Sequence, residues 1–121
     1  MTNKILIADD ERTIADTLTT IVKMHGFEAR AAYDGEQAVA AARGWKPDIF
    51  LTDLLMPGMD GVDAALAICR ILPNCRILLL SGMMANSELA ARLRGHDFEV
   101  LLKPVPPEEL VARLAAGRTE H

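Results

Sequence analysis

The chain has 121 residues, half of them apolar and a quarter charged, and a formal net charge of −4. A mildly acidic chain of this length predicts one domain over residues 1–121 and argues against direct nucleic-acid binding, which depends on Lys and Arg to neutralise phosphates. No apolar run could span a membrane and no secretory signal is visible, so we expect a cytoplasmic protein. Cys69 and Cys75 form no C-x-x-C pair and are expected to be buried free thiols.

The first half of the chain alternates between strand-like and helical patterns. The apolar run 4–8 predicts a buried strand, and apolar residues at helical spacing then continue to the stop signal His25-Gly26. A second strand is expected over 27–33. The next helix is expected over 38–44, with Asp34 as its N-cap and a glutamine three residues later as the reciprocal capping residue.

The same alternation continues into the second half. The apolar run 48–52 predicts a third strand, which leads through a loop into a helix with apolar residues from Val62 to Leu72. A fourth strand is expected over 75–80, and the helix that follows it is placed between Ser81 and Gly95. Continuous apolar runs of this kind are typical of parallel strands that helices cover on both faces.

The last strand and helix complete the pattern. The apolar run 98–102 predicts a fifth strand, and Pro106-Pro107 followed by two glutamates is typical of a helix start. Five alternations of strand and helix predict an α/β domain with a doubly wound, parallel, five-stranded sheet. Periodicity alone leaves the order of the strands open.

A polar side chain follows directly after four of the five apolar runs. Asp9 and Asp10 follow the first, Asp53 the third, Ser81 the fourth and Lys103 the fifth. Parallel strands end at one edge of their sheet, where open α/β sheets bind their ligands, so we expect these side chains to converge. Three carboxylates in one pocket repel one another unless a cation holds them ionised, and Mg²⁺ suits such hard oxygen ligands.

This set of residues also suits phosphoryl transfer. A carboxylate such as that of Asp53 can act as a nucleophile and form an aspartyl phosphate, while an ammonium and a hydroxyl suit the phosphoryl oxygens. Each part alone has an ordinary explanation: Asp9-Asp10 as a helix N-cap, Lys103-Pro104 as a turn, and Ser81 as a loop residue. Their placement after four separate strands favours a common site, because independent loops have no reason to converge.

At these positions the chain resembles the receiver domain of two-component response regulators, over essentially its whole length. The resemblance depends on Asp9-Asp10, on Asp53 with the sequence Met-Pro-Gly-Met-Asp-Gly at 56–61, on Ser81 and on Lys103-Pro104. It implies a flavodoxin-like fold with strand order 2-1-3-4-5. It also implies a phosphorelay switch that catalyses only its own phosphorylation and dephosphorylation and is not otherwise an enzyme.

The resemblance assigns a role to each site residue. Asp53 would accept the phosphoryl group from a sensor histidine kinase or a phosphotransfer protein, Lys103 would contact that group, and Ser81 would move to hydrogen-bond it. The implied ligands of Mg²⁺ are the side chains of Asp9, Asp10 and Asp53 and the backbone carbonyl of Leu55. The Lys103-Pro104 bond is expected to be cis. Phosphorylation would then alter a surface that an unknown downstream protein or effector domain reads.

One feature of the sequence departs from the pattern of many receivers, and a second bears on the lifetime of the phosphorylated state. Val100 stands three residues before the lysine, where many receivers have the aromatic residue of a rotamer switch, and valine is stiff and has no ring. We therefore expect the signal to leave through the loop 81–86 and the fourth helix. Leu55 and Met83 flank the expected path of attacking water and cannot orient it, which predicts slow self-dephosphorylation unless both side chains merely cover the pocket.

Other functions remain open at this stage. One alternative is a Mg²⁺-dependent phosphatase with an aspartyl nucleophile, which would usually carry Asp-x-Asp after one strand. Another is a flavodoxin-like cofactor binder, but the acids after the first strand would repel a flavin phosphate. A binding module that works without phosphorylation is a further alternative. A mixed-charge surface on the last two helices could also pair two copies of the chain after phosphorylation; it comprises Arg92, Arg94, Glu108, Glu109 and Arg113.

Overall fold

The structure is a computed structural model, and it describes residues 3–82 and 87–117. Within them, five strands and five helices alternate along the chain. The strands are β1 (Lys4–Ala8), β2 (Glu28–Ala32), β3 (Ile49–Asp53), β4 (Arg76–Ser81) and β5 (Glu99–Leu102). The helices are α1 (Arg12–Met24), α2 (Gly35–Trp45), α3 (Gly61–Ile71), α4 (Ser87–Leu93) and α5 (Pro107–Ala116).

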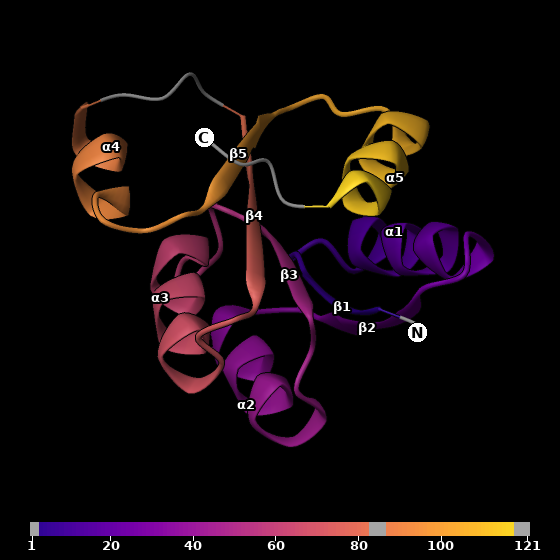
Figure 1. Cartoon of the computed structure of the whole chain (residues 1–121). Helices are drawn as coiled ribbons and strands as arrows, with labels where there is room; N and C mark the ends of the chain where they lie inside the picture. Colours follow the sequence, from indigo (N-terminus) through magenta and orange to yellow (C-terminus); the bar gives the residue numbers. More distant parts are fainter. Residues whose placement is uncertain (1–2, 83–86, 118–121) are drawn as a thin grey trace.

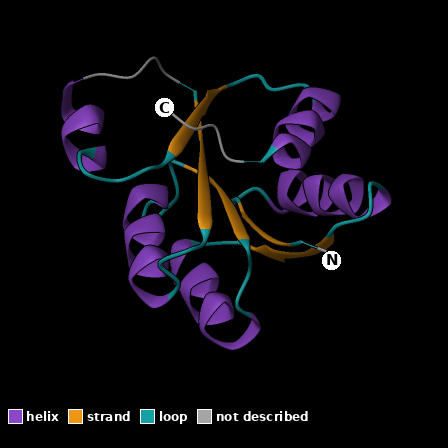
Figure 2. Cartoon of the chain, in the orientation of Figure 1, coloured by secondary structure: helices purple, strands orange, loops and turns teal. Residues whose placement is uncertain are grey.

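All five strands are parallel and lie in the order β2-β1-β3-β4-β5. This confirms the predicted doubly wound α/β fold and the strand order that the resemblance implied. Figures 1 and 2 show the sheet as a central layer, with α1 and α5 on one side and α2 and α3 on the other. Because the strands are all parallel, their carboxyl ends lie together at one edge of the sheet.

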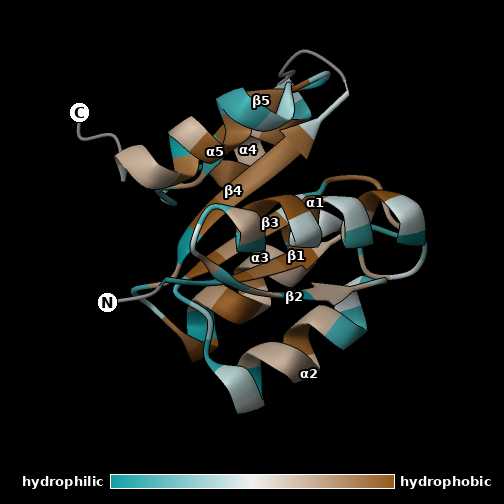
Figure 3. Cartoon of the chain, turned by 90° about the vertical axis from the view of Figure 1, so that its right-hand side faces the viewer, coloured by the Kyte–Doolittle hydropathy of each residue, from teal (hydrophilic) through white to brown (hydrophobic). Residues whose placement is uncertain are grey.

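The strands alternate in which hydrophobic cluster their side chains join. On β1, Leu6 belongs to the cluster beneath α2 and α3, whereas Ile5 and Ile7 belong to the cluster beneath α1 and α5. Phe50 and Leu51 divide in the same way on β3, and all five side chains are almost completely buried. Figure 3 shows apolar residues concentrated along β1, β3 and β4, as strands covered on both faces require.

The second helix has the predicted N-cap, begins earlier at Gly35 and ends later than predicted. The Asp34 carboxylate accepts a hydrogen bond from the Gln37 backbone N–H at 2.7 Å, and the Gln37 side chain accepts one from the Tyr33 N–H at 3.0 Å. The helix continues beyond Gly44 to Trp45. Lys46, with φ of 54°, takes the left-handed conformation that closes it, a conformation more often taken by glycine. Local composition had predicted the stop too early.

The fifth strand is more exposed than a buried parallel strand should be, which corrects the sequence prediction. β5 lies at the edge of the sheet, and its burial alternates, with Val100 37% and Leu102 54% exposed. The helix before it, α4, has seven residues and fully buries none of them. The outer face of this edge strand is therefore only partly covered.

Two smaller predictions can be compared with the structure. Neither cysteine forms a disulfide with a described residue; Cys75 is buried, but Cys69 is only half-buried. Among the described residues, no helix combines the length and apolar character needed to cross a membrane.

Candidate functional site

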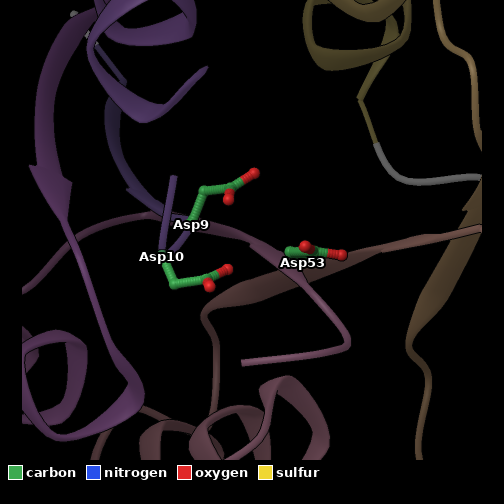
Figure 4. Close-up of side chains that lie close together, drawn as sticks. All are labelled: Asp9, Asp10 and Asp53. Atoms are coloured by element: carbon green, nitrogen blue, oxygen red, sulfur yellow. The ribbon is translucent and has the colours of Figure 1, made fainter. Parts of the chain in front are cut away.

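Three carboxylates converge at the carboxyl edge of the sheet. Asp9 and Asp10 follow β1, and Asp53 is the last residue of β3. One carboxylate oxygen from each lies within 4.8 Å of those from the other two, and Figure 4 shows the three side chains projecting into a common space. The convergence expected from the separate strand ends is therefore present for all three acids.

Asp9 is the most buried of these acids, with 2% of its surface exposed. Its Oδ1 accepts a hydrogen bond from the Glu11 backbone N–H at 2.9 Å. Burial raises the pKa of Asp9 above its usual 3.8, and the nearby charges of Asp53 and Asp10 raise it further, against the opposing effects of the Glu11 hydrogen bond and Lys103. The site therefore resists holding three negative charges without a compensating cation.

The ordinary explanation of Asp9-Asp10 as the cap of the next helix does not fit. The N-cap of α1 is Glu11, and no side chain caps the helix there. The two aspartates lie before the cap, with Asp10 exposed beside the cluster. Three oxygen donors at this separation form a set that a hard divalent cation such as Mg²⁺ can bind, since it prefers carboxylate oxygens and retains several waters.

Lys103, which directly follows the edge strand β5, supplies a positive charge to the site. Its Nζ lies 3.0 Å from Asp53 Oδ1, with 36% of the lysine side chain and 14% of the aspartate side chain exposed. The Lys103-Pro104 peptide bond is cis, as the resemblance implied. The Lys103 backbone N–H also donates to the Ser81 carbonyl at 2.7 Å, so the backbone joins the last two strands at this point.

Ser81, at the end of β4, lies at the same edge and is 4% exposed. The Leu55 side chain is 71% exposed just after the phosphoacceptor candidate, Asp53. Met83 and most of the loop 81–86 lie outside the described residues, so the predictions made for them remain predictions.

The loop after Asp53 is fixed by two close backbone approaches. Gly61, the first residue of α3, donates its N–H to the Leu54 carbonyl at 2.9 Å, and a Cβ at this position would collide with the Asp53 carbonyl. Gly35, at the start of α2, faces Met59 so closely that a Cβ would lie 2.6 Å from its carbonyl oxygen. Side chains larger than hydrogen cannot occupy either glycine position without moving this loop.

Sequence reasoning missed two ion-pair clusters outside the acidic site. Arg92 of α4, which the sequence placed only in a mixed-charge surface, pairs with Asp60 and Asp63 at the start of α3, both at 2.9 Å. Arg76 at the start of β4 pairs with Glu99 at the start of β5 at 2.6 Å, and both side chains are 8% exposed. The only sequence signal for the Arg76–Glu99 pair was that each residue stands near the start of an apolar run.

Comparisons with known proteins identify the family to which this sequence is similar. The family model of the response regulator receiver domain matches residues 5–115. The DNA-binding response regulator MtrA of Mycobacterium tuberculosis is 34% identical over 119 residues, which cover 96% of this chain and 50% of MtrA. MtrA of Mycobacterium leprae is also 34% identical, over 96% of this chain and 51% of its own length. The chain thus spans about half the length of these curated relatives.

A solved structure agrees in fold. The chemotaxis protein CheY4 of Vibrio cholerae superposes with a TM-score of 0.85 at 27% sequence identity, and the match covers 96% of this chain and 98% of CheY4. The agreement extends over the sheet and the helices on both of its faces.

Proposed function

Because the chain belongs to the family of response regulator receiver domains, we propose that residues 1–121 form one such domain, a signalling switch whose phosphoacceptor is Asp53. Phosphorylation and Mg²⁺ binding are general features of this family, and its members are signalling switches rather than classical enzymes. The observation that carries the assignment is the position of Asp53 between two other carboxylates and the Lys103 ammonium. No other arrangement among the described residues combines these groups.

The proposed reaction is transfer of a phosphoryl group to the Asp53 carboxylate. A carboxylate oxygen attacks the phosphorus of a phosphohistidine on a sensor histidine kinase or a phosphotransfer protein, and a P–O bond forms as the P–N bond breaks. The electron pair of the broken bond returns to the imidazole. The Lys103 ammonium, which hydrogen-bonds the Asp53 carboxylate before the transfer, binds the phosphoryl oxygens after it. The Ser81 hydroxyl donates a hydrogen bond to one of these oxygens.

Metal binding is assigned to this chain's acids. Mg²⁺ bound by Asp9, Asp10, Asp53 and the backbone carbonyl of Leu55 would neutralise negative charge on the phosphoryl group. The proximity of the three carboxylates and the raised pKa of Asp9 support this ligand set. Self-dephosphorylation is catalysed in the same site and is slow, because Leu55 has no group that can orient water.

The signal leaves through the loop 81–86 and α4. Val100 is too stiff and too small to act as an aromatic rotamer switch, and it is already 37% exposed. Phosphorylation shifts an existing equilibrium by drawing Ser81 toward the new oxygens. In an amide-shift experiment, changes should extend into α4; changes confined to the loops around Asp53 would contradict this route.

The output goes to a protein or domain that recognises this altered surface. The curated relatives are named DNA-binding response regulators, and this chain spans about half of each. We assign no DNA contact to the receiver itself, because its net charge is −4. Pairing of two phosphorylated copies is a second output, supported by the exposed Val100 and Leu102 on β5. Of the mixed-charge residues first assigned to that interface, Arg92 and Arg113 already form ion pairs within the chain.

The proposal is tested by intact mass after incubation with acetyl phosphate and Mg²⁺. A single phosphoryl adduct should form, and it should be lost in Asp53→Asn and in the presence of a chelator. Phosphotransfer from a histidine kinase is the second arm of the test, because a receiver that needs its own kinase does not react with acetyl phosphate. A folded protein that binds Mg²⁺ but accepts phosphate from neither source would contradict the proposal and favour a phosphorylation-independent module.

A further inference from the structure

Arg92 binds the start of α3 with both ends of its guanidinium. Nη1 donates to Asp60 Oδ2 at 2.9 Å, and Nη2 donates to Asp60 Oδ1 at 3.2 Å and to Asp63 Oδ1 at 2.9 Å. The bidentate geometry fixes the direction as well as the distance of the contact. The side chains are partly exposed, at 35% for Arg92 and 32% for Asp60, so the pair can open without creating a buried unpaired charge.

Asp60 is more than a surface carboxylate. It is the N-cap of α3, and its Oδ1 also accepts the Asp63 backbone N–H at 2.9 Å. Burial alone would raise the pKa of Asp60, but the hydrogen bonds from Arg92 and from the Asp63 N–H hold that pKa below its usual 3.8. The carboxylate is therefore ionised and engaged on two sides, by its own helix and by α4.

The start of α3 lies directly against the phosphoacceptor. Gly61 follows Asp60, hydrogen-bonds the Leu54 carbonyl, and leaves no space for a Cβ against the Asp53 carbonyl. Arg92 is thus connected to Asp53 through Asp60 and Gly61, a short sequence of direct contacts. A displacement of Arg92 acts on the helix start that borders the phosphorylated residue.

The rest of α4 is weakly anchored. None of its residues is fully buried, and its apolar contribution to the core comes from Leu89 and Leu93, both partly buried against the cluster beneath α2 and α3. Since no residue of α4 is fully buried, little apolar surface is exposed when the helix moves as a unit. The Arg92 ion pairs with Asp60 and Asp63 therefore help to set the position of α4 in the unphosphorylated protein.

We propose that Arg92 is a latch that holds α4 on the start of α3 in the unphosphorylated protein and opens when Asp53 is phosphorylated. This rests on the proposed function, because it deepens the route by which the phosphorylated site reaches α4. If phosphorylation displaces α4, the Arg92 pairs with Asp60 and Asp63 must break, and their strength opposes the active state. Linkage then requires that loss of the latch strengthens binding of a phosphoryl group.

The test uses beryllofluoride, a stable mimic of the phosphoryl group, in the presence of Mg²⁺. Its dissociation constant is measured by calorimetry on the full chain for the unaltered protein, Arg92→Ala and Arg92→Lys. Arg92→Ala should bind about twofold to fivefold more tightly, the range expected from losing a partly exposed ion pair. Arg92→Lys keeps the charge without the fork, and its affinity should lie between the two.

Two further variants separate a latch from a general loss of stability. Arg43→Ala removes an exposed arginine from the last turn of α2, which belongs to no proposed binding surface, and should leave the affinity unchanged. Asp63→Asn weakens the pair from the other side while keeping the Asp60 cap, so it should tighten binding and reduce the additional effect of Arg92→Ala.

The outcomes that overturn the proposals are distinct. If the unaltered protein binds beryllofluoride and Arg92→Ala binds it equally or more weakly, the latch is wrong while the proposed function stands. If the unaltered, folded protein binds Mg²⁺ but no beryllofluoride, the proposed function fails and the latch fails with it. Equal tightening by Arg43→Ala would assign the effect to net charge and would also overturn the latch.

Discussion

Lys103, just after β5, reaches past the end of β4 to Asp53 at the end of β3, and its Nζ lies 3.0 Å from Asp53 Oδ1. The contact joins residues that are 50 positions apart in the chain. It places a cation against the carboxylate that lies beside two other acids. Lys103 therefore partly offsets the charge repulsion among the three acids.

Replacing Lys103 by methionine should affect metal and phosphoryl binding in opposite directions. Without the ammonium, the three acids attract Mg²⁺ at least as strongly as before, while the phosphoryl oxygens lose their positive partner. We expect Mg²⁺ affinity to be equal or higher and the phosphorylated fraction to fall severalfold, measured by calorimetry and by intact mass.

The matched control for this prediction is Lys23→Met, which removes an exposed lysine from the last turn of α1. It should change neither quantity. Normal phosphorylation of Lys103→Met would show that the lysine serves only the unphosphorylated structure.

Asp9→Asn should stabilise the protein in the absence of divalent cations. Burial and the neighbouring acids raise the pKa of Asp9 above 3.8. The ionised carboxylate therefore destabilises the folded protein, and the stability falls as the pH rises from 3.8 through the raised pKa. Asparagine avoids this cost and keeps an oxygen for the Glu11 N–H. Thermal unfolding at neutral pH should show a higher midpoint for the variant than for the unaltered protein.

Mg²⁺ should reverse that order. At a free concentration a hundredfold above the dissociation constant, metal binding stabilises a folded protein by about 2.7 kcal/mol. The unaltered protein should gain this stabilisation and Asp9→Asn should gain much less. Glu36→Gln, an exposed change on α2, serves as the control. An Asp9→Asn variant that is less stable without metal would contradict the electrostatic account.

The Arg76–Glu99 pair should make a pH-dependent contribution to stability. Burial alone would raise the pKa of Glu99, but hydrogen bonds from Arg76 and Arg113 hold it below the usual 4.5. The stabilisation is therefore present above pH 4.5 and is lost as the pH falls through the lowered folded-state value. Glu99→Gln leaves Arg76 buried without its charge partner and should cost about 3 kcal/mol at neutral pH.

Urea unfolding measures this difference, with Glu108→Gln in the exposed first turn of α5 as the control. The difference between Glu99→Gln and the unaltered protein should shrink below pH 4.5. A difference that stays constant across this range would assign the effect to packing rather than to charge.

Leu55→Asn should shorten the lifetime of the phosphorylated state. The Leu55 side chain is 71% exposed, so the change leaves the core intact and adds an amide that can hold water near the phosphoryl group. Decay of the phosphoryl adduct, followed by intact mass, should accelerate severalfold. Leu55→Ala separates the explanations: if it accelerates decay as much as asparagine does, the leucine merely covers the pocket.

The sequence predicted the acidic site well because strand ends in a parallel sheet have a fixed common edge. Once the apolar runs preceding Asp9, Asp53 and Lys103 were identified, their convergence followed from topology without knowledge of side-chain positions. The resemblance to receivers added the strand order and the cis bond before Pro104, neither of which periodicity could provide.

Features that depend on how the elements pack against one another were not predicted. The ion pairs of Arg92 could not be predicted from its local sequence, because its partners lie at the start of another helix, 29 and 32 positions away. Arg76 and Glu99 interrupt two apolar runs, but their pairing requires β4 and β5 to be neighbours. The exposure of β5 similarly depends on its place at the edge of the sheet, which an apolar run does not reveal.

The central claim is that Asp53 itself carries the phosphoryl group, and peptide mapping after borohydride reduction tests it most directly. Reduction converts an aspartyl phosphate into homoserine at the modified position. We predict homoserine at residue 53 alone in protein treated with a phosphoryl donor and Mg²⁺, and none in untreated protein. Homoserine at residue 9 or 10, or a stable adduct that yields none, would contradict the account.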